Sequence, residues 1–211
     1  MASRILGLVV LALAPLAVQA QAPTGDATRG KALAYTCNGC HAIPNYKNVY
    51  PTYSVPKLHG QRPEYLVAAL KAYKSGERSH GTMHSQASSL NEQDMADVAV
   101  YLSGSEVLTA SKNDVPATSR PKATEVCLAC HGTNGVGITA DYPTIAGQHK
   151  DYIERALHDY QKGGRKNAIM AGMAATLTAE DIEQLAAYYS AQKPALETLK
   201  LHNNFTSTAA K

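Results

Sequence analysis

Apolar residues recur three and four positions apart in four stretches of the chain, which is the spacing of one buried helix face. The first stretch runs from Pro63, a favourable first-turn residue, to Gly76, and the second begins at the N-cap residue Asn91. The other two begin at Asp151 and Thr178. Their apolar positions are Leu66, Ala69, Leu70 and Tyr73; Met95, Val98, Ala99 and Leu102; Ile153, Ala156, Leu157 and Tyr160; and Ile182, Leu185, Ala186 and Tyr189. No stretch shows the sustained alternation of a strand, so the pattern predicts an all-α fold.

The last two of these helices repeat the first two. Residues 143–190 are identical to residues 56–103 at 16 of 48 positions, at a constant offset of 87. The motif Cys-x-x-Cys-His occurs twice, and its copies are 90 residues apart. The first half therefore has three extra residues between its motif and Pro56. Two homologous domains in tandem explain both offsets.

The N-terminal stretch has the parts of a secretory signal peptide. Arg4 precedes a nearly continuous apolar run over residues 5–18, and small residues follow it, with cleavage expected after Ala20 or Ala22. The run is shorter than the roughly 20 apolar residues that span a membrane. We therefore expect export to the periplasm. The expected division is a signal peptide at 1–20, an N-terminal domain at 21–103, a linker at 104–118, a C-terminal domain at 119–192 and a tail at 193–211.

Composition narrows the classes of function. The apolar content of 45% is that of a globular chain, and a net charge of +3 without any run of like charges disfavours nucleic-acid binding. Twelve Tyr, one Phe and no Trp leave few fully apolar rings for the cores of two small domains. A large cofactor in each half would fill that space.

The Cys-x-x-Cys-His motif supplies such a cofactor. On a helix, its two thiols and its imidazole share one face, so the thiols can bond to one edge of a haem while the imidazole reaches the iron. Structural zinc fits two pairs 90 residues apart poorly, a thioredoxin-like site needs a βαβ setting, and disulfides leave each His unexplained. We predict two covalent c-type haems. Their attachment residues are Cys37, Cys40, Cys127 and Cys130, and their first iron ligands are His41 and His131.

The repeat also narrows the choice of the sixth iron ligand. Among the Met and His residues of the mature chain outside the two motifs, only Met83 and Met170 occupy the same position in both halves. Both lie in segments expected to be loops ahead of the last helix of each half. Met95 belongs to an apolar helix face, as a core residue does. Met173, one turn beyond Met170, is the main competitor, and His84 is a weaker one.

Four further repeated residues are candidates for supporting the haem sites. An iron-bound His usually donates its other N–H to a carbonyl or carboxylate, and Pro56 and Pro143 can supply a carbonyl; the alternative is a plain turn proline. Arg78 and Arg165 precede the Met segments and can pair with haem propionates. The alternative for these two is a solvated surface charge.

Together these features resemble the dihaem cytochrome c4 family. Each half has Cys-x-x-Cys-His, Pro-x-(Leu/Ile)-x-Gly-Gln and a late Met before a short terminal helix, and the resemblance covers nearly all of residues 25–192. It implies two tandem class I cytochrome c domains, each wrapped around a covalent haem with His/Met ligation, packed through a pseudo-twofold interface. It also implies a periplasmic electron carrier. One departure is the longer stretch after His41, in which Tyr46, Tyr50 and Tyr53 cluster.

Three classes of function remain open. The first is an electron carrier between respiratory partners, in the direction of a terminal oxidase. The second is a dihaem subunit of a dehydrogenase complex, for example a flavin sulfide dehydrogenase. The third is a dihaem enzyme, but a thiosulfate-oxidising enzyme would need an additional Cys ligand and a peroxidase an open iron position. We therefore expect an electron carrier with redox protein partners rather than an enzyme, and a loose association with the membrane stays open.

Overall fold

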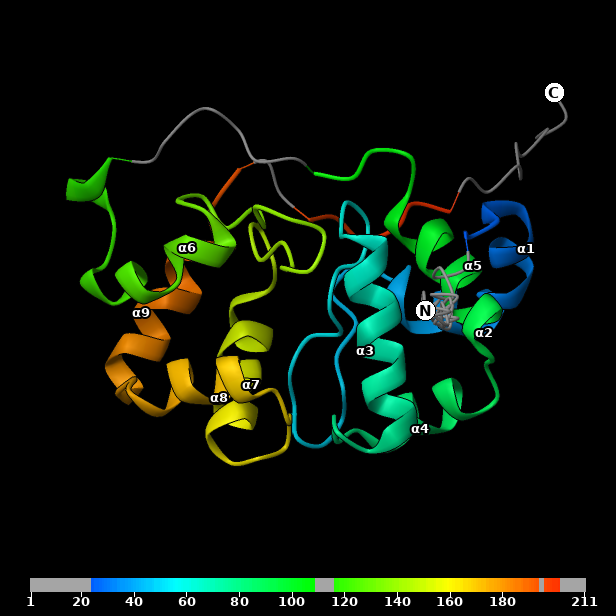
Figure 1. The fold of residues 1–211 in the computed structure, drawn as a ribbon, viewed down its shortest axis with the longest axis horizontal. Helices are drawn as coiled ribbons and strands as arrows, with labels where there is room; N and C mark the ends of the chain where they lie inside the picture. The colour runs from blue at the N-terminus through cyan, green and yellow to red at the C-terminus, as the bar shows by residue number, and fades with distance from the viewer. Residues whose placement is uncertain (1–23, 109–115, 194–195, 202–211) are drawn as a thin grey trace, which may run out of the picture.

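The computed structural model describes residues 24–108, 116–193 and 196–201. The expected signal peptide, residues 1–20, lies outside the described residues, as do parts of the expected linker and tail. Two helical halves lie side by side, with the second half on the left of Figure 1. Within the described ranges the chain forms helices and three isolated β-bridges but no strand, which agrees with the all-α prediction.

Each half has two longer helices with a shorter helix between them. The first half contains α1 (Ala27–Leu33), α2 (Tyr35–His41), α3 (Pro63–Ser75), α4 (Gly81–Ser88) and α5 (Glu92–Ser103). The second half contains the 3₁₀ helices η1 (Ala117–Ser119) and η2 (Lys122–Val126), followed by α6 (Leu128–His131), α7 (Lys150–Gln161), α8 (Ala168–Ala175) and α9 (Ala179–Ser190). The long helices pack in equivalent pairs, α3 against α5 and α7 against α9.

The four predicted helices are confirmed, and their ends have the expected local chemistry. Gly76 ends α3 in the left-handed conformation that glycine adopts without strain. The N-cap residues Asn91 and Thr178 each form a capping box with an Asp three positions on, which satisfies backbone groups at the starts of α5 and α9. Both boxes are local, so the sequence alone is enough to place these helix starts.

The segments that contain the two candidate Met ligands are helices, not the loops that we expected. Met83 lies in α4, and Met170 lies in α8. Each helix begins at a residue whose side chain accepts a hydrogen bond from the Met backbone N–H, His80 in α4 and Asn167 in α8. The expectation was wrong because neither segment shows an amphipathic period, and a cap alone is a weak signal of a helix.

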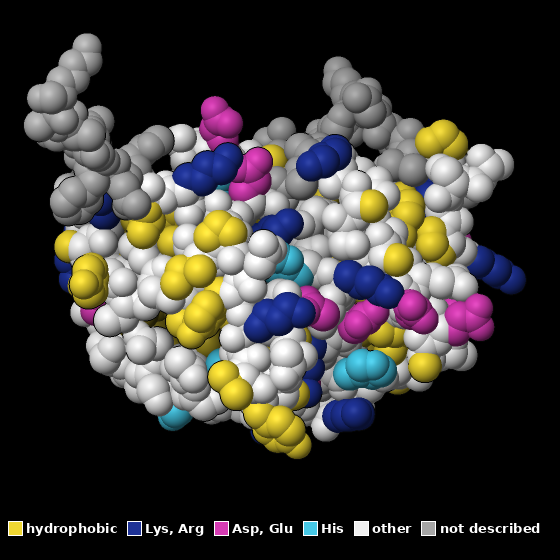
Figure 2. Space-filling view, turned by 180° about the vertical axis from the view of Figure 1, so that it is seen from behind, with side chains coloured by type: hydrophobic (Ala, Val, Ile, Leu, Met, Phe, Trp, Pro, Cys, Tyr) yellow, Lys and Arg dark blue, Asp and Glu magenta, His cyan; other side chains and the backbone are white. Residues whose placement is uncertain are grey.

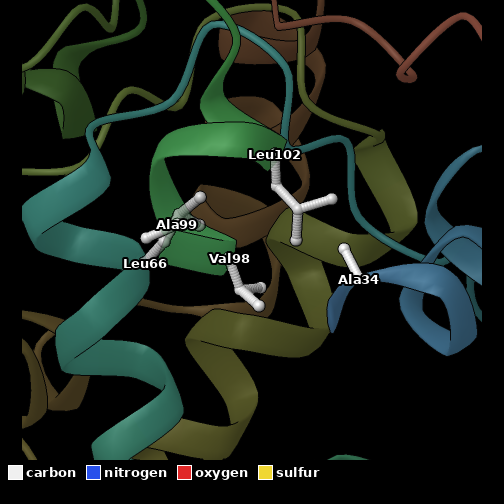
Figure 3. Packing of buried hydrophobic residues seen from close by; sticks show 5 residues of the cluster. All are labelled: Ala34, Leu66, Val98, Ala99 and Leu102. Atoms are coloured by element: carbon white, nitrogen blue, oxygen red, sulfur yellow. The ribbon is translucent and has the colours of Figure 1, made fainter. Parts of the chain in front are cut away.

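The hydrophobic cores of the two halves are small and equivalent. In the first half, side chains from α3 and α5 converge beside the junction of α1 and α2, as Figure 3 shows. This cluster consists of Ala34, Leu66, Val98, Ala99 and Leu102. The second cluster consists of Ile153, Leu185, Ala186 and Tyr189. Every member of the second cluster lies 87 positions after a member of the first, so the sequence repeat is also a repeat in packing.

The two halves are joined by backbone pairing around Arg78 and Arg165. These two residues form an antiparallel bridge, and its two hydrogen bonds have N···O distances of 2.8 and 2.7 Å. The pairing joins positions that are equivalent in the repeat. It therefore agrees with a pseudo-twofold relation between the halves.

Two buried glutamines make a second set of reciprocal contacts. The Gln61 amide donates to the Thr144 carbonyl at 2.8 Å and accepts from the Thr144 N–H at 2.9 Å. The Gln148 amide pairs with the Lys57 backbone in the same way, with both distances 3.0 Å. The two glutamines are 3% and 5% exposed; the bonds of Gln61 are buried, and those of Gln148 are partly buried. We call these two contacts the glutamine clasps.

Part of the region that we expected to be a tail, residues 193–211, packs against both halves. Leu196 is 1% exposed, and its N–H donates to the Ala146 carbonyl at 2.9 Å. Glu197 and His59 exchange backbone hydrogen bonds at 3.0 and 3.1 Å. A comparison of the two repeats cannot reveal this contact, because the segment has no copy in the first half.

The surface mixes charges of both signs. On the face seen in Figure 2, Lys and Arg side chains lie beside Asp and Glu side chains rather than forming a patch of one sign. Exposed charges also form ion pairs, such as Lys71–Glu92 and Lys150–Glu183. Among the described residues, no helix has the length and apolar character needed to cross a membrane.

Candidate haem-binding sites

Each half places its Cys-x-x-Cys-His motif on one helical turn. In the first half this turn is the end of α2, and in the second half it is α6, with Cys127 as the N-cap. All four cysteines are free thiols. Burial raises the pKa of the Cys37 and Cys127 thiols, so both are protonated at neutral pH. The two turns thus present the pairs of thiols that covalent haem attachment requires.

A proline carbonyl holds the imidazole of each motif. Nδ1 of His41 lies 3.0 Å from the Pro56 carbonyl oxygen, and Nδ1 of His131 lies 2.9 Å from that of Pro143. A carbonyl only accepts hydrogen bonds, so Nδ1 must hold the proton and Nε2 keeps its lone pair. Burial also lowers the pKa of both imidazoles, which favours this neutral form. Each His is therefore prepared to bind iron through Nε2.

A cavity of about 860 Å³ is lined by residues of both halves. His41 and Met83 line it from the first half, and His131 and Met170 line it from the second. Three of the four motif cysteines also contribute to the wall. Thiols, imidazoles with a free lone pair and a cavity beside them are what two c-type haems need, so the residues fit this cofactor.

The competing candidates for the sixth ligand lie elsewhere or are already engaged. Met95 is 2% exposed on α5 and does not line the cavity. Met173 is 41% exposed and is not part of the cavity wall either. Nδ1 of His84 lies 2.8 Å from the Tyr73 carbonyl oxygen, outside the cavity lining. The structure thus brings Met83 and Met170, and neither of the other two methionines in its described part, into the cavity wall.

Arg78 and Arg165 are buried between the halves, 8% and 7% exposed, so the alternative of solvated surface charges is wrong for both. Both guanidinium groups donate to the hydroxyl of Tyr152, that of Arg165 at 3.2 Å. Burial raises the pKa of this hydroxyl, but the two positive charges outweigh it and lower the pKa to about 8. One carboxylate is near the cluster, that of Asp159, which lies 3.8 Å from Nε of Arg165. The cluster is therefore rich in positive charge and suited to an anionic group.

The extra residues of the first half form a hairpin at this interface, residues 46–55, closed by an isolated bridge and backbone hydrogen bonds. Tyr53 is 9% exposed, and its ring centroid lies 6.4 Å from that of Tyr152. The Ser54 N–H and hydroxyl donate to one carboxylate oxygen of Asp151 at 3.0 and 2.9 Å. The hairpin, shown in cyan-blue between α3 and α7 in Figure 1, thus contacts both halves.

Comparison with known proteins agrees with this arrangement. Residues 27–106 match the family described as cytochrome c, and residues 118–188 match the family described as cytochrome C oxidase, cbb3-type, subunit III. Cytochrome c4 of Pseudomonas aeruginosa is 33% identical over 179 residues, which cover 78% of this chain and 87% of that protein. The chain belongs to the cytochrome c4 family.

One solved structure and one further protein are also similar to this chain over most of their length. The crystal structure of reduced recombinant cytochrome c4 from Pseudomonas stutzeri matches 80% of this chain and 100% of that chain, with a TM-score of 0.63 and 29% identity. A thiosulfate dehydrogenase electron acceptor of Stutzerimonas stutzeri is 29% identical over 199 residues, covering 83% of this chain and 89% of that protein. The chain is a dihaem c-type cytochrome of the cytochrome c4 type, an electron carrier rather than an enzyme.

Sequence reasoning missed three features of this cytochrome c4 site. Tyr152 is not among the candidate site residues of the sequence analysis, although its hydroxyl joins the two arginines. Gln61 and Gln148 were noted only as part of the repeated motif. His80 was set aside because its counterpart is Asn167, yet both residues cap the helix of a candidate Met ligand. The sequence does contain a signal for these residues. Each lies at a position that is polar in both halves of the repeat, although the haem attachment motif does not require a polar residue there.

Proposed function

We propose that this cytochrome carries electrons between respiratory partners in the periplasm, in the direction of a terminal oxidase. We further propose that His41 and Met83 ligate one haem iron and that His131 and Met170 ligate the other. When bound, each haem supplies an iron that alternates between two oxidation states. The observation that supports this proposal most directly is one cavity wall that contains a His and a Met from each half.

The chain's own residues would hold each iron closed on both sides. Nε2 of His41 and Nε2 of His131 would each bind one iron, and the orientation of each ring is fixed by a proline carbonyl. A neutral, soft Met thioether at the other position favours reduced iron and raises the potential relative to a second His. An iron with six ligands has no site for substrate. This arrangement supports electron transfer and argues against a peroxidase.

We propose that the buried arginines Arg78 and Arg165 bind haem propionates. Both Nε atoms are buried and make no hydrogen bond in the described structure, although the Asp159 carboxylate lies 3.8 Å from that of Arg165, so each guanidinium has hydrogen-bonding capacity left over. A buried charge is costly unless it is paired and hydrogen-bonded, and a carboxylate ion pair with an Arg is among the strongest hydrogen-bonded contacts. The Tyr152 hydroxyl, which accepts a hydrogen bond from each guanidinium, would keep the two groups in place.

A second candidate function is service to a dehydrogenase as its electron acceptor. It is favoured by the relative named as a thiosulfate dehydrogenase electron acceptor, which this chain matches over 89% of that protein's length. In this role, the same two haem sites would accept electrons from a specific dehydrogenase, either after diffusion or within a stable complex. The two candidates differ in the partner and not in the chemistry of the sites.

Replacement of the Met ligands tests the ligation. Met83→His should lower the potential of one haem, and Met170→His that of the other, in a spectroelectrochemical titration of the holoprotein. Met83→Ala and Met170→Ala should each remove about half of the weak long-wavelength sulfur-to-iron absorption, because the two haems contribute equally to this band. Met95→Leu is the control and should change neither property. If both Ala variants keep the full band, the ligation is wrong.

Purification and kinetics test the partner. The exported protein should be recovered from the periplasm without its first 20 or 22 residues, and its ferrous form should be oxidised by membranes that contain a terminal oxidase. Cyanide, which inhibits the oxidase, should stop this reaction. Copurification with a dehydrogenase, together with reduction only by that enzyme's substrate, would instead establish the second candidate.

A further inference from the structure

The two candidate Met ligands are held in the same way by residues that differ chemically. Each Met is the third residue of its helix, and its backbone N–H is bound by the N-cap side chain. In α4 the acceptor is Nδ1 of His80, at 3.2 Å from the Met83 nitrogen. In α8 the acceptor is Oδ1 of Asn167, at 3.0 Å from the Met170 nitrogen. The cap fixes the helical turn from which each thioether extends.

His80 has a second ring nitrogen, and this nitrogen contacts the hairpin. Nε2 of His80 lies 3.2 Å from Oδ1 of Asn48. Because Nδ1 accepts the Met83 N–H, the neutral ring must hold its proton on Nε2, where it can be donated to Asn48. One imidazole thus joins residues 46–55 to the helix of Met83. The second half has neither the imidazole nor the three extra residues.

The ring is also held by aromatic contacts. It lies edge-on to Tyr53 of the hairpin and to Tyr73 of α3, with centroid distances of 6.4 and 6.3 Å. The next hairpin residue, Ser54, is bound by Asp151 at the start of α7 in the other half. The position of His80 is therefore set by the hairpin and, through the hairpin, by the domain interface.

We propose that Asn48 and His80 are positioning residues for the first haem, which hold Met83 in place as its sixth ligand and make this ligand less easily displaced than Met170. The inference rests on the proposed ligation of the first iron by Met83. Loss of one hydrogen bond of ordinary net strength corresponds to about a two- to tenfold change in an equilibrium or rate. Breaking the link should therefore loosen the Met at one haem without removing it.

The test measures how fast cyanide displaces the Met ligand of each oxidised haem in the holoprotein, followed by loss of the long-wavelength absorption. Met83→Ala identifies the kinetic phase that belongs to the first haem. Asn48→Ala removes the side-chain oxygen that accepts from His80 and the side-chain amide N–H that donates to the Tyr53 carbonyl. Asn48→Asp keeps the accepting oxygen and loses only the amide donor. His80→Asn retains a capping side chain, as Asn167 does in the second half, but is too short to bridge to the hairpin as well.

Asn48→Ala and His80→Asn should accelerate the first-haem phase about two- to tenfold, by the loss of one hydrogen bond. The rate of the first-haem phase in Asn48→Asp should stay within about twofold of the wild-type rate. The rate of the second-haem phase should not change in any of the three variants. If Asn48→Ala and His80→Asn both leave the first phase unchanged, or if Asn48→Asp accelerates it as much as Asn48→Ala does, the positioning role is refuted while the ligation stands. If Met83→Ala leaves both phases and the absorption band intact, both the ligation and the positioning role are refuted.

Discussion

The glutamine clasps should contribute a large share of the coupling between the two halves. Replacing Gln61 with Ala removes the donor and the acceptor that pair with the Thr144 backbone. It also removes an acceptor for the N–H of Arg62, 2.9 Å away. The matched variant Gln148→Ala removes the same three bonds on the other side, to Lys57 and to the N–H of His149.

The magnitude follows from the number of bonds and their burial. Three hydrogen bonds at about 1 kcal/mol each amount to about 3 kcal/mol, and the buried backbone groups left without partners keep the loss near that size. A stability of about 5–15 kcal/mol is usual for a folded protein, so each clasp is a substantial part of it. For a chain of this length, about 3 kcal/mol corresponds to a decrease in Tm of about 6–12 °C.

Differential scanning calorimetry of the haem-loaded protein is the appropriate assay. If the clasps couple the halves, each single variant should melt at lower temperature, and the double variant should show two separate transitions, one for each half. The two single variants should lose similar amounts, because their bonds are equivalent. A decrease below about 2 °C for both single variants, less than 1 kcal/mol by the same conversion, would refute the reasoning.

Two further predictions concern the first half. The N–H of Asp26 and the guanidinium of Arg29 hold the pKa of Asp97 in the folded protein below its ordinary 3.8. The ionised Asp97 carboxylate therefore stabilises the fold fully above pH 3.8, and this stabilisation is lost as the pH falls through the lower pKa of the folded protein. The Tm of Asp97→Asn should therefore lie below that of the wild type at pH 7, and the difference should shrink below pH 3.8 in thermal melts followed by circular dichroism; a constant difference would contradict this explanation. A Cβ on Gly30 would lie 2.0 Å from the Asp97 carbonyl oxygen, so Gly30→Ala should lower the free energy of unfolding by about 1–3 kcal/mol in urea titrations. Gly39→Ala, with nothing within 4 Å, is the control and should not lower it.

Most of the fold could be predicted from the sequence because it depends on local signals. The starts of α5 and α9 depend on capping boxes within four residues, and the buried faces of the long helices depend on helical spacing. The repeat then provides a second copy of the pattern for each of these helices. The short helices α4 and α8 were missed because their sequences have no apolar face, and only their single capping side chains mark them.

The candidate sites were predictable to the extent that the repeat marks them. The attachment motifs and the paired Met83 and Met170 could be read from equivalent positions. The role of Tyr152 could not, because it depends on two arginines, one of them 74 residues away in the other half. The hairpin and the segment of Leu196 each occur in only one half, so the repeat gives no second copy with which to compare them. The residues that they contact are determined only by tertiary packing.

The glutamine clasps and the paired backbones of Arg78 and Arg165 have the form of contacts between two identical subunits. In such an interface every contact occurs twice, once from each subunit, or joins two equivalent residues. Such an interface is what gene duplication would leave behind if the ancestor of each half paired with a second copy of itself. Fusion would then replace a concentration-dependent dimer by a tethered one. It would also free the two copies from identity. In a symmetric dimer, any new hairpin appears twice, whereas in the fused chain one haem site can acquire features that the other lacks.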